Sequence, residues 1–254
     1  MTLVNAEYFT FDGVDIRKAL EDKGFLFIVN NTKGRGILGQ DTQTFSVSGI
    51  DGTRLLDVTI PEREIEVQYT LVADNLVKLR EAESYLASLL VRETVKPLSF
   101  VDQEGGYEAI LTGYETNLET DTVQQGSITF LCPNPFRYKD TVEIKNMQFS
   151  ANVPQTITVD ANYYTEAVIR VNVLTPTNDI QLTVNDSVIR YKADSNIIQG
   201  QVVVFDGEAQ ECRQAGILKV LEVSGDFPLL QSNLNTITIN TPALLTIKYR
   251  ERDL

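Results

Sequence analysis

Histidine and tryptophan are absent from the 254-residue sequence, which also holds only two cysteines. Without histidine there is no imidazole general base, no serine-histidine-aspartate triad and no histidine-ligated zinc. Catalysis would have to rest on carboxylates, lysine, tyrosine or a substrate-assisted route. The missing indole also removes the strongest stacking surface for a sugar. The composition therefore favours a protein that is not an enzyme and has no catalytic residues, cofactor or metal site.

The two cysteines, Cys132 and Cys212, lie far apart and do not form a disulfide framework. We expect reduced thiols that serve as small buried hydrophobes, in a chain made and folded in a cytoplasm. No apolar run approaches the roughly 20 residues that span a bilayer. The start, MTLVNAEYFTFDGVD, lacks the basic and apolar stretches of a signal peptide. The sequence therefore predicts no membrane association.

Negative charge dominates, with 35 acidic side chains, 22 basic ones and a net charge of -13. A general nucleic-acid-binding surface needs a basic face that neutralises phosphates. The average charge argues against such a surface, although it leaves room for a local basic patch.

The first half of the chain combines alternating strands with one helical stretch. Apolar and polar residues alternate over residues 64–71, as in an antiparallel strand with one buried face. Apolar residues then recur at helical spacing, so we expect a helix over about residues 72–92, with Asp74 as its N-cap. Further strands are expected at residues 98–101, 109–112 and 127–131.

Pro133 and Pro135 end this sheet because neither can donate a ladder hydrogen bond. The second half shows short strands and no long helical period, which is typical of a β-sandwich. We therefore predict a mainly β protein with two domains, a β-sandwich plus one helix over residues 1–139 and a second β-sandwich over residues 140–254. The expected strands of the second domain include residues 180–184 and 187–191, joined by a two-residue turn at Asn185 and Asp186, and residues 218–223.

One glycine motif matches a nucleotide-binding pattern by letter. Residues 34–39, Gly-Arg-Gly-Ile-Leu-Gly, read as G-x-G-x-x-G, but the dinucleotide site also requires a helix to open at the last glycine. Residues 40–47 alternate like a strand instead. We therefore interpret Lys33, Gly34, Arg35 and Gly36 as part of a flexible hairpin tip.

Two further sets of residues, three glutamates and two tyrosines, each have a purely structural and a functional interpretation. Glu62, Glu64 and Glu66 share one strand face, which favours a solvated or channel-lining surface over a metal site. Tyr163 and Tyr164 are candidates for sugar stacking, but adjacent residues on a strand point to opposite faces, so we expect one in the core and one exposed.

Four segments together resemble the distal tail protein family of siphophages, the phages with long non-contractile tails. Their order and spacing agree with the family over essentially the whole chain. Two places differ from the family pattern. The family often has P-G-R-D-G where residues 48–52 read Ser-Gly-Ile-Asp-Gly, and a glycine that is usual before the final N-x-I is replaced near Ser232 and Asn233. The four segments are Tyr8–Asp15 (YFTFDGVD), Gly126–Tyr138 (GSITFLCPNPFRY), Ser224–Leu230 (SGDFPLL) with Asn233–Ile237 (NLNTI), and Ile247–Arg252 (IKYRER).

This resemblance implies a hexameric ring built from N-terminal domains, with a galectin-like C-terminal β-sandwich projecting outward. It implies a virion protein at the tail tip or baseplate, a hub that joins the tail tube protein to the tail-associated fibre or lysin protein. In some phages such a hub also carries receptor-binding proteins. A central channel would pass DNA as transient cargo, and we hypothesise that Glu62, Glu64 and Glu66 line it. The loop from Lys33 to Gly39 would be an assembly loop that reaches along the ring axis or to a neighbouring subunit.

Two other functions stay open on sequence alone. A carbohydrate-binding module would use the second sandwich to hold cell-wall glycans, through Tyr163 or Tyr164. A carboxylate-based hydrolase would need two carboxyl groups about 5 to 10 Å apart in a cleft. Nothing in the sequence pairs two carboxyl groups in this way.

Overall fold

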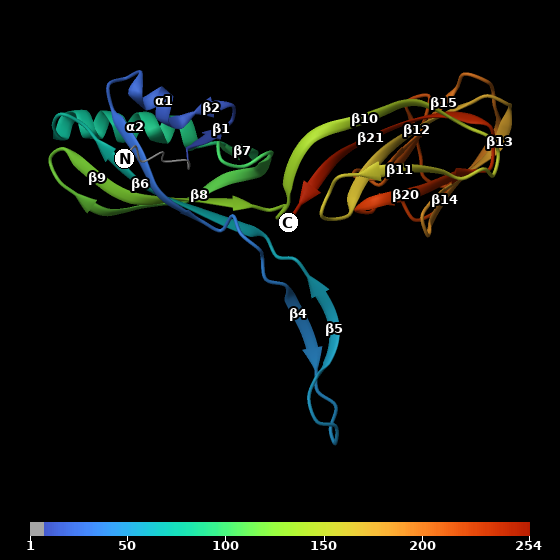
Figure 1. Ribbon diagram of the computed structural model, residues 1–254, viewed down its shortest axis with the longest axis horizontal. Coiled ribbons are helices and arrows are strands. Elements are labelled where there is room, and N and C mark those ends of the chain that lie inside the picture. Colours follow the sequence, from blue (N-terminus) through green and yellow to red (C-terminus); the bar gives the residue numbers. More distant parts are fainter. Residues whose placement is uncertain (1–7) are drawn as a thin grey trace. The chain divides into compact units, whose positions relative to one another are not determined.

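The computed structural model describes residues 8–254, which separate into two compact units. The first unit ends at Arg137 and the second runs from Tyr138 to Asp253, where the sequence placed the boundary at residue 139. Each unit has its own cluster of buried apolar side chains. Strands dominate both units (Figure 1), so the chain is mainly β, as predicted.

The first unit contains both helices found in residues 8–254. Its elements, in chain order, are β1 (Phe9–Phe11), β2 (Val14–Asp15), α1 (Ile16–Glu21), β3 (Leu26–Lys33), β4 (Asp41–Phe45), β5 (Arg54–Thr59), β6 (Arg63–Val72), α2 (Leu76–Leu90), β7 (Lys96–Phe100), β8 (Gly106–Glu119) and β9 (Val123–Cys132).

An antiparallel sheet with the order β3-β6-β9-β8 forms the body of this unit. The start of β8 also pairs with β7, which pairs with β1, so the long β8 belongs to both groups of strands. Both helices lie on the same side of β6, β8 and β9 (Figure 1). Leu79, Ala82 and Leu86 of α2 are fully buried in the core on that side. The other face of the sheet lies outside this core.

The predicted helix exists, but it is shorter than residues 72–92. Val72 is the last residue of β6 and pairs with Leu26 and Val123 on either side, so it belongs to the sheet. Asn75, not Asp74, is the N-cap, because its side-chain oxygen accepts a hydrogen bond from the backbone N–H of Lys78 at 3.0 Å.

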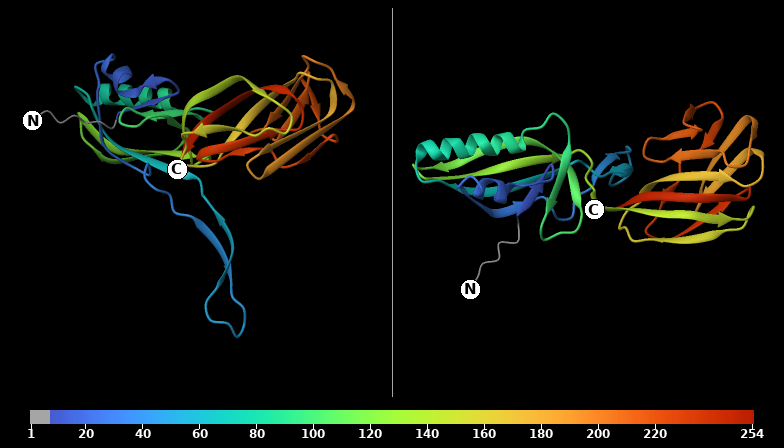
Figure 2. Two further views of the ribbon diagram at one scale, coloured as in Figure 1. Left: turned by 45° about the vertical axis from the view of Figure 1, so that its right-hand side comes forward. Right: turned by 90° about the horizontal axis from the view of Figure 1, so that it is seen from above.

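The second unit is a β-sandwich with the core between its two sheets. One sheet has the order β17-β16-β15-β12-β21-β10 and the other β11-β20-β13-β14-β18 (Figure 2). The strands are β10 (Arg137–Phe149), β11 (Gln155–Val159), β12 (Thr165–Val173), β13 (Thr177–Val184), β14 (Ser187–Ile197), β15 (Val202–Asp206), β16 (Glu211–Gln214), β17 (Ile217–Lys219), β18 (Val223–Gly225), β19 (Leu229–Leu230), β20 (Asn233–Ile239) and β21 (Ala243–Asp253).

One expected hairpin of this unit is confirmed and one expected strand is wrong. Val184 pairs with Ser187, so Asn185 and Asp186 form the two-residue turn between β13 and β14. Residues 218–223 are not one strand. Lys219 of β17 pairs with Cys212 in one sheet, and Val223 of β18 pairs with Tyr191 in the other. The chain crosses between two sheet edges here, which a local alternation of residues cannot reveal.

Candidate assembly surfaces

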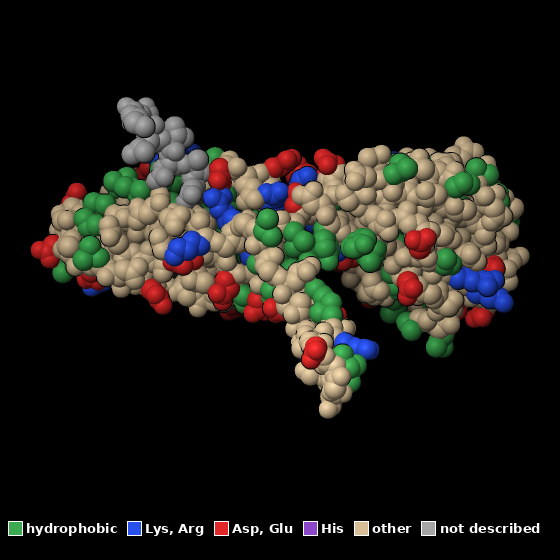
Figure 3. Space-filling view, turned by 60° about the horizontal axis from the view of Figure 1, so that its bottom comes forward, with side chains coloured by type: hydrophobic (Ala, Val, Ile, Leu, Met, Phe, Trp, Pro, Cys, Tyr) green, Lys and Arg blue, Asp and Glu red, His purple; other side chains and the backbone are tan. Residues whose placement is uncertain are grey.

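A two-stranded hairpin, which we call the arm (residues 41–59), stands apart from both larger sheets. β4 and β5 pair only with each other, and every residue of both strands is exposed. Figure 3 shows hydrophobic side chains at its surface. The large apolar side chains exposed on the arm, with their exposed fractions, are Phe45 (40%), Ile50 (51%), Leu55 (59%), Leu56 (64%) and Val58 (38%).

The arm is poorly suited to stand alone in water. An isolated two-stranded hairpin is at best marginally stable, because it has no apolar face covered by another layer. Burial of a fully exposed Leu or Phe side chain contributes about 1.5 to 3 kcal/mol, and each of these partly exposed side chains gains a part of that when it is covered. The arm therefore has the character of a segment that is stabilised by a covering surface.

The arm is firmly rooted by Arg63, the first residue of β6. This side chain is fully buried, and its Nη1 donates to the carbonyl oxygens of Gly34 at 2.6 Å and Gly36 at 2.8 Å. Its Nε donates to the carbonyl oxygen of Pro135 at 2.9 Å. Within residues 8–254, Arg63 has no carboxylate partner, so its charge is stabilised by these three backbone carbonyls and by the Tyr107 ring, whose centroid lies 5.3 Å from its Cζ. Such a buried cation strongly favours the one path of residues 34–36 that provides these acceptors.

Gly34 is also needed for steric reasons. Its φ is +87°, a conformation that favours glycine, and a Cβ atom there would lie 1.8 Å from the carbonyl oxygen of Glu64. The next residue, Arg35, forms an ion pair with Asp102 at 2.6 Å and lies 4.5 Å above the Phe100 ring. These two contacts tie the segment to the end of β7 and to the turn that follows it.

The interpretation of Lys33, Gly34, Arg35 and Gly36 as a flexible hairpin tip is therefore wrong. Lys33 ends β3 and pairs with Glu66 at 3.3 Å, and the next residues form the clamped connection that leads into the arm. The predicted strand over residues 40–47 is confirmed as β4. The glycine at position 34 permits a close approach and a positive φ; it does not loosen the chain.

The face of the sheet away from the helices carries two of the three candidate channel residues. Glu64 and Glu66 point away from the buried Ile65 and Val67, as predicted, whereas Glu62 precedes β6 and is exposed. Across the strands, Glu64 faces Leu131 and Glu66 faces Thr129. The same face also carries Gln68, Thr70, Gln125 and Ser127.

Glu66 stays ionised on this face. A hydrogen bond from Gln68 Nε2 at 2.9 Å and the ammonium group of Lys33 together hold the pKa of Glu66 below its usual value of 4.5. The sheet therefore presents fixed negative charge in a polar setting. No group of three or more His, Cys, Asp or Glu residues in residues 8–254 is arranged to hold a metal ion.

Tyr163 and Tyr164 lie in the loop before β12, not on a strand, so the expectation that one of them is in the core is wrong. Tyr163 is partly buried and Tyr164 is 48% exposed. Their rings meet edge to face, with centroids 5.4 Å apart and planes 75° apart. Arg252 lies 5.7 Å above the Tyr163 ring, donates to the carbonyl oxygen of Tyr164 and pairs with Glu166 at 2.5 Å. The pair offers one exposed ring, not a flat platform of two.

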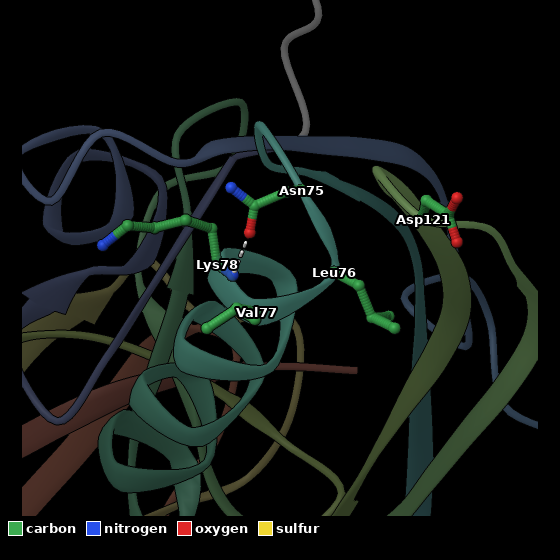
Figure 4. A pocket seen from close by; sticks show the side chains of 5 residues that line it. All are labelled: Asn75, Leu76, Val77, Lys78 and Asp121. Atoms are coloured by element: carbon green, nitrogen blue, oxygen red, sulfur yellow. Dashed lines mark hydrogen bonds between the residues drawn. The ribbon is translucent and has the colours of Figure 1, made fainter.

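An open depression of about 640 Å³ lies at the start of α2 (Figure 4). It is lined by Asn75, Leu76, Val77, Lys78 and Asp121. Figure 4 shows Asn75 turned toward the backbone of Lys78, whose N–H it caps. Asn75 thus serves as the cap of the helix, the ammonium group of Lys78 pairs with Glu81, and Leu76 and Val77 leave apolar surface exposed. Neither helix of residues 8–254 is long and apolar enough to cross a membrane.

Comparison with known proteins places both halves of the chain in phage tails. Residues 17–132 match a family model described as a phage tail protein RIFT-related domain, and residues 160–253 match the C-terminal domain of a siphovirus-type tail component. The distal tail protein of Bacillus phage SPP1 is 24% identical over 219 residues, which cover 83% of this chain and 84% of the relative. The chain belongs to the distal tail protein family of siphophages.

The resemblance that the sequence motifs indicated is thus confirmed. A crystal structure of the SPP1 distal tail protein, described as a hub of the adsorption apparatus in phages that infect Gram-positive bacteria, matches with a TM-score of 0.79. The match covers 97% of this chain and 99% of that one at 18% identity, which shows a shared fold. As a distal tail family member, the chain is a structural component of a phage tail and is located in the virion.

The structure shows where the segment that corresponds to the P-G-R-D-G motif of the distal tail family lies. Residues 48–52, where the family often has P-G-R-D-G, lie in the turn between β4 and β5. Gly49 and Gly52 both have positive φ, at +83° and +85°, so the two glycines shared with the family motif shape the tip of the arm.

Proposed function

We propose that the chain forms a homohexameric ring that serves as the hub at the distal end of the phage tail. The ring joins the tail tube protein on one side to the tail-associated fibre or lysin protein on the other. It passes DNA through a central channel and supports the receptor-binding proteins that mediate host adsorption. The ring is assembled in the host cytoplasm, and the chain has no enzymatic role in it.

The rooted and exposed arm is the observation that carries this proposal. A hairpin with five large exposed apolar side chains is stabilised when another surface covers it. The hydrogen bonds from Arg63 to Gly34 and Gly36 fix the point at which the arm starts. The arm therefore loses less conformational entropy when it docks on another surface. A second copy of the chain, laid against the arm, supplies the covering surface.

The edge of the first sheet supports a ring in a second way. β3 pairs with β6 on one side only, within residues 8–254. A ring requires heterologous interfaces, in which one patch meets a different patch of the neighbour. An open strand edge next to a projecting arm provides two different patches on one subunit.

The polar sheet face supports the channel. Glu64 and Glu66 lie on it among mostly polar side chains, and Glu66, which pairs with Lys33, remains ionised at neutral pH. A wall of this composition repels phosphate, so DNA passes without binding to it. We assign Glu62, Glu64 and Glu66 to the channel side of the ring.

Sedimentation velocity on the full chain tests the role of the arm. The double variant Leu55→Ser and Leu56→Ser keeps the backbone of the hairpin but removes two of its exposed apolar side chains. As a matched control, Leu234→Ser removes a side chain of similar exposure, 62%, in the second unit. We expect the control to associate like the wild type and the arm variant to associate at least tenfold more weakly.

Two results would contradict the proposal. If the arm variant associates as well as the wild type, the arm is not part of the contact between copies. If glycan titration or peptidoglycan digestion shows saturable sugar binding or hydrolysis by a chain that does not self-associate, the carbohydrate-binding or hydrolase alternative replaces the hub.

A further inference from the structure

We propose that the arm of one copy docks on the outer face of the larger sheet of the second unit of another copy, where Asp57 meets Arg170. This inference rests on the proposed self-association through the arm, and it names the surface that receives the arm. We call this surface the Arg170 face. It comprises the outward side chains of Val168, Arg170, Val204, Arg213, Thr246 and Lys248, with the carboxylate of Asp206 at its edge, opposite Val168.

Strand register brings these side chains together. Arg170 on β12 pairs with Val204 on β15 and with Thr246 on β21, so it lies at the centre of three neighbouring strands. Lys248 pairs with Val168, two positions along the same strands and therefore on the same face. The alternate residues of β12, such as Ile169, are fully buried in the core, so Arg170 points away from it.

Two cations on this face lack a carboxylate. Arg170 and Lys248 are exposed, and neither forms an ion pair within residues 8–254. Arg213, the third cation of the face, already pairs with Glu211 at 2.6 Å. A central arginine flanked by partly buried valines is typical of the anchors of protein interfaces, and its charge calls for a carboxylate from the partner.

The arm matches this chemistry. Asp57 is exposed, has no ion pair within residues 8–254, and stands between the apolar Leu56 and Val58. The arm contains three aspartates and one arginine, so its net charge is opposite to that of Arg170 and Lys248. Gln43 pairs with Asp57, and Phe45 lies two positions further along β4, on the same face of the hairpin as Asp57. The Phe45 ring would cover the valines around Arg170, and the exclusion of water would strengthen the ion pair.

The two surfaces also agree in size. Six residues of β5 extend over about 20 Å, at roughly 3.3 Å per residue. The row from Leu218 through Arg213, Val204 and Arg170 to Thr246 crosses five strands, which span about 19 Å at roughly 4.8 Å per strand. Packing of a two-stranded sheet on a larger one, with the two layers about 10 Å apart, is ordinary sheet-on-sheet geometry.

A charge swap tests the contact directly. Full-length Arg170→Asp, Asp57→Arg and the double variant would be compared by sedimentation velocity at equal concentration and at low and high salt. Lys192→Glu on β14 of the other sheet and Glu104→Arg in the first unit serve as matched controls, since both side chains are exposed and without an ion pair within residues 8–254. Circular dichroism establishes that each variant is folded.

We expect each single variant to associate about tenfold to a hundredfold more weakly, as for close charge pairs at other interfaces. The double variant should recover to within about threefold of the wild type, and the controls should match the wild type. High salt should weaken the association of the wild type and of the double variant.

Each other outcome overturns the inference in a distinct way. If the Leu55 and Leu56 variant loses association while Arg170→Asp keeps it, the arm docks elsewhere and only this inference fails. If Arg170→Asp weakens association but the double variant does not recover, another carboxylate meets Arg170. If neither the arm nor Arg170 matters, or if the wild type stays monomeric, the inference and the proposed role of the arm fail together.

Discussion

The Nη1 atom of Arg63 lies 2.6 Å from the carbonyl oxygen of Gly34, and this contact joins the first residue of β6 to the segment that leads into the arm. A fully buried guanidinium that donates to three backbone carbonyls, and that has no carboxylate partner within residues 8–254, fixes the path of those backbones. The direction in which the arm leaves the first unit is therefore set at this point.

Removal of the Arg63 side chain should destabilise the first unit. Arg63→Leu leaves three carbonyl oxygens without their donor, those of Gly34, Gly36 and Pro135. We expect the free energy of unfolding to fall by about 2 to 4 kcal/mol, as for other losses of a buried charged hydrogen-bond network. Urea denaturation measures it. Arg54→Leu, an exposed arginine on β5, is the control and should change stability by less than about 0.5 kcal/mol.

Substitution of Gly34 and of Gly36, the two glycines that accept hydrogen bonds from Arg63, should affect stability very differently. Gly34→Ala brings a Cβ atom to 1.8 Å from the carbonyl oxygen of Glu64 in a backbone conformation with φ of +87°. We expect a loss of about 2 to 4 kcal/mol, measured by chemical denaturation. Gly36→Ala, which has no atom within 4 Å of its Cβ position and no positive φ, should be nearly neutral. Equal effects of the two substitutions would mean that the close approach of Gly34 to β6 is not needed.

The acidic sheet face should matter for DNA passage and not for ring formation. The double variant Glu62→Lys and Glu64→Lys turns part of the proposed channel wall basic, while Glu66 keeps its contacts with Lys33 and Gln68. We expect rings of normal mass and phage particles that eject DNA more slowly, because cations on the wall bind phosphate. Glu208→Lys in the second unit is the control. Unchanged ejection by the double variant would remove these residues from the channel.

The second unit should become acid-sensitive through Asp179. The guanidinium of Arg190 donates twice to this carboxylate, at 2.7 and 2.5 Å, and holds the pKa of Asp179 below its usual value of 3.8. A depressed pKa in the folded state contributes stability above the usual pKa, and that stability is lost as pH falls through the folded value. We expect Asp179→Asn to lower the melting temperature at pH 7 and to differ little from the wild type near pH 2.

Calorimetry at pH 7 and near pH 2 measures the difference in melting temperature between Asp179→Asn and the wild type. Asp186→Asn, in the exposed turn between β13 and β14, should leave the melting temperature unchanged at both. If the difference in melting temperature between Asp179→Asn and the wild type does not change with pH, the ion pair with Arg190 is not its cause.

Local sequence patterns predicted those parts of the fold that depend on local periodicity. Alternation in residues 64–71 placed Glu64 and Glu66 opposite the core, and the leucine spacing revealed α2. The exact start of α2 escaped prediction because Asp74 and Asn75 are both good N-caps, and only the hydrogen bond to Lys78 decides between them.

The arm and its root depend on long-range contacts, which local patterns do not contain. Arg63 lies in an ordinary strand position, yet its acceptors are 27, 29 and 72 residues away. β5 is also exposed on all sides, so it lacks the alternation that marks a half-buried strand. In the sequence, Gly34 looks like part of a flexible loop because it is a glycine at the end of a strand. Only its positive φ and its close approach to the carbonyl oxygen of Glu64, seen in the structure, show that its position is fixed.

The mass of the native assembly tests the central claim most directly. Native mass spectrometry of the full-length 28.4 kDa chain, over a range of concentrations, would show which multiple of the subunit mass is populated. We predict six copies, or multiples of six if rings stack, and a shift to smaller species when Leu55 and Leu56 are replaced by serine. A wild-type chain that remains a monomer at high concentration, alone and with its tail partners, would contradict the proposed hub.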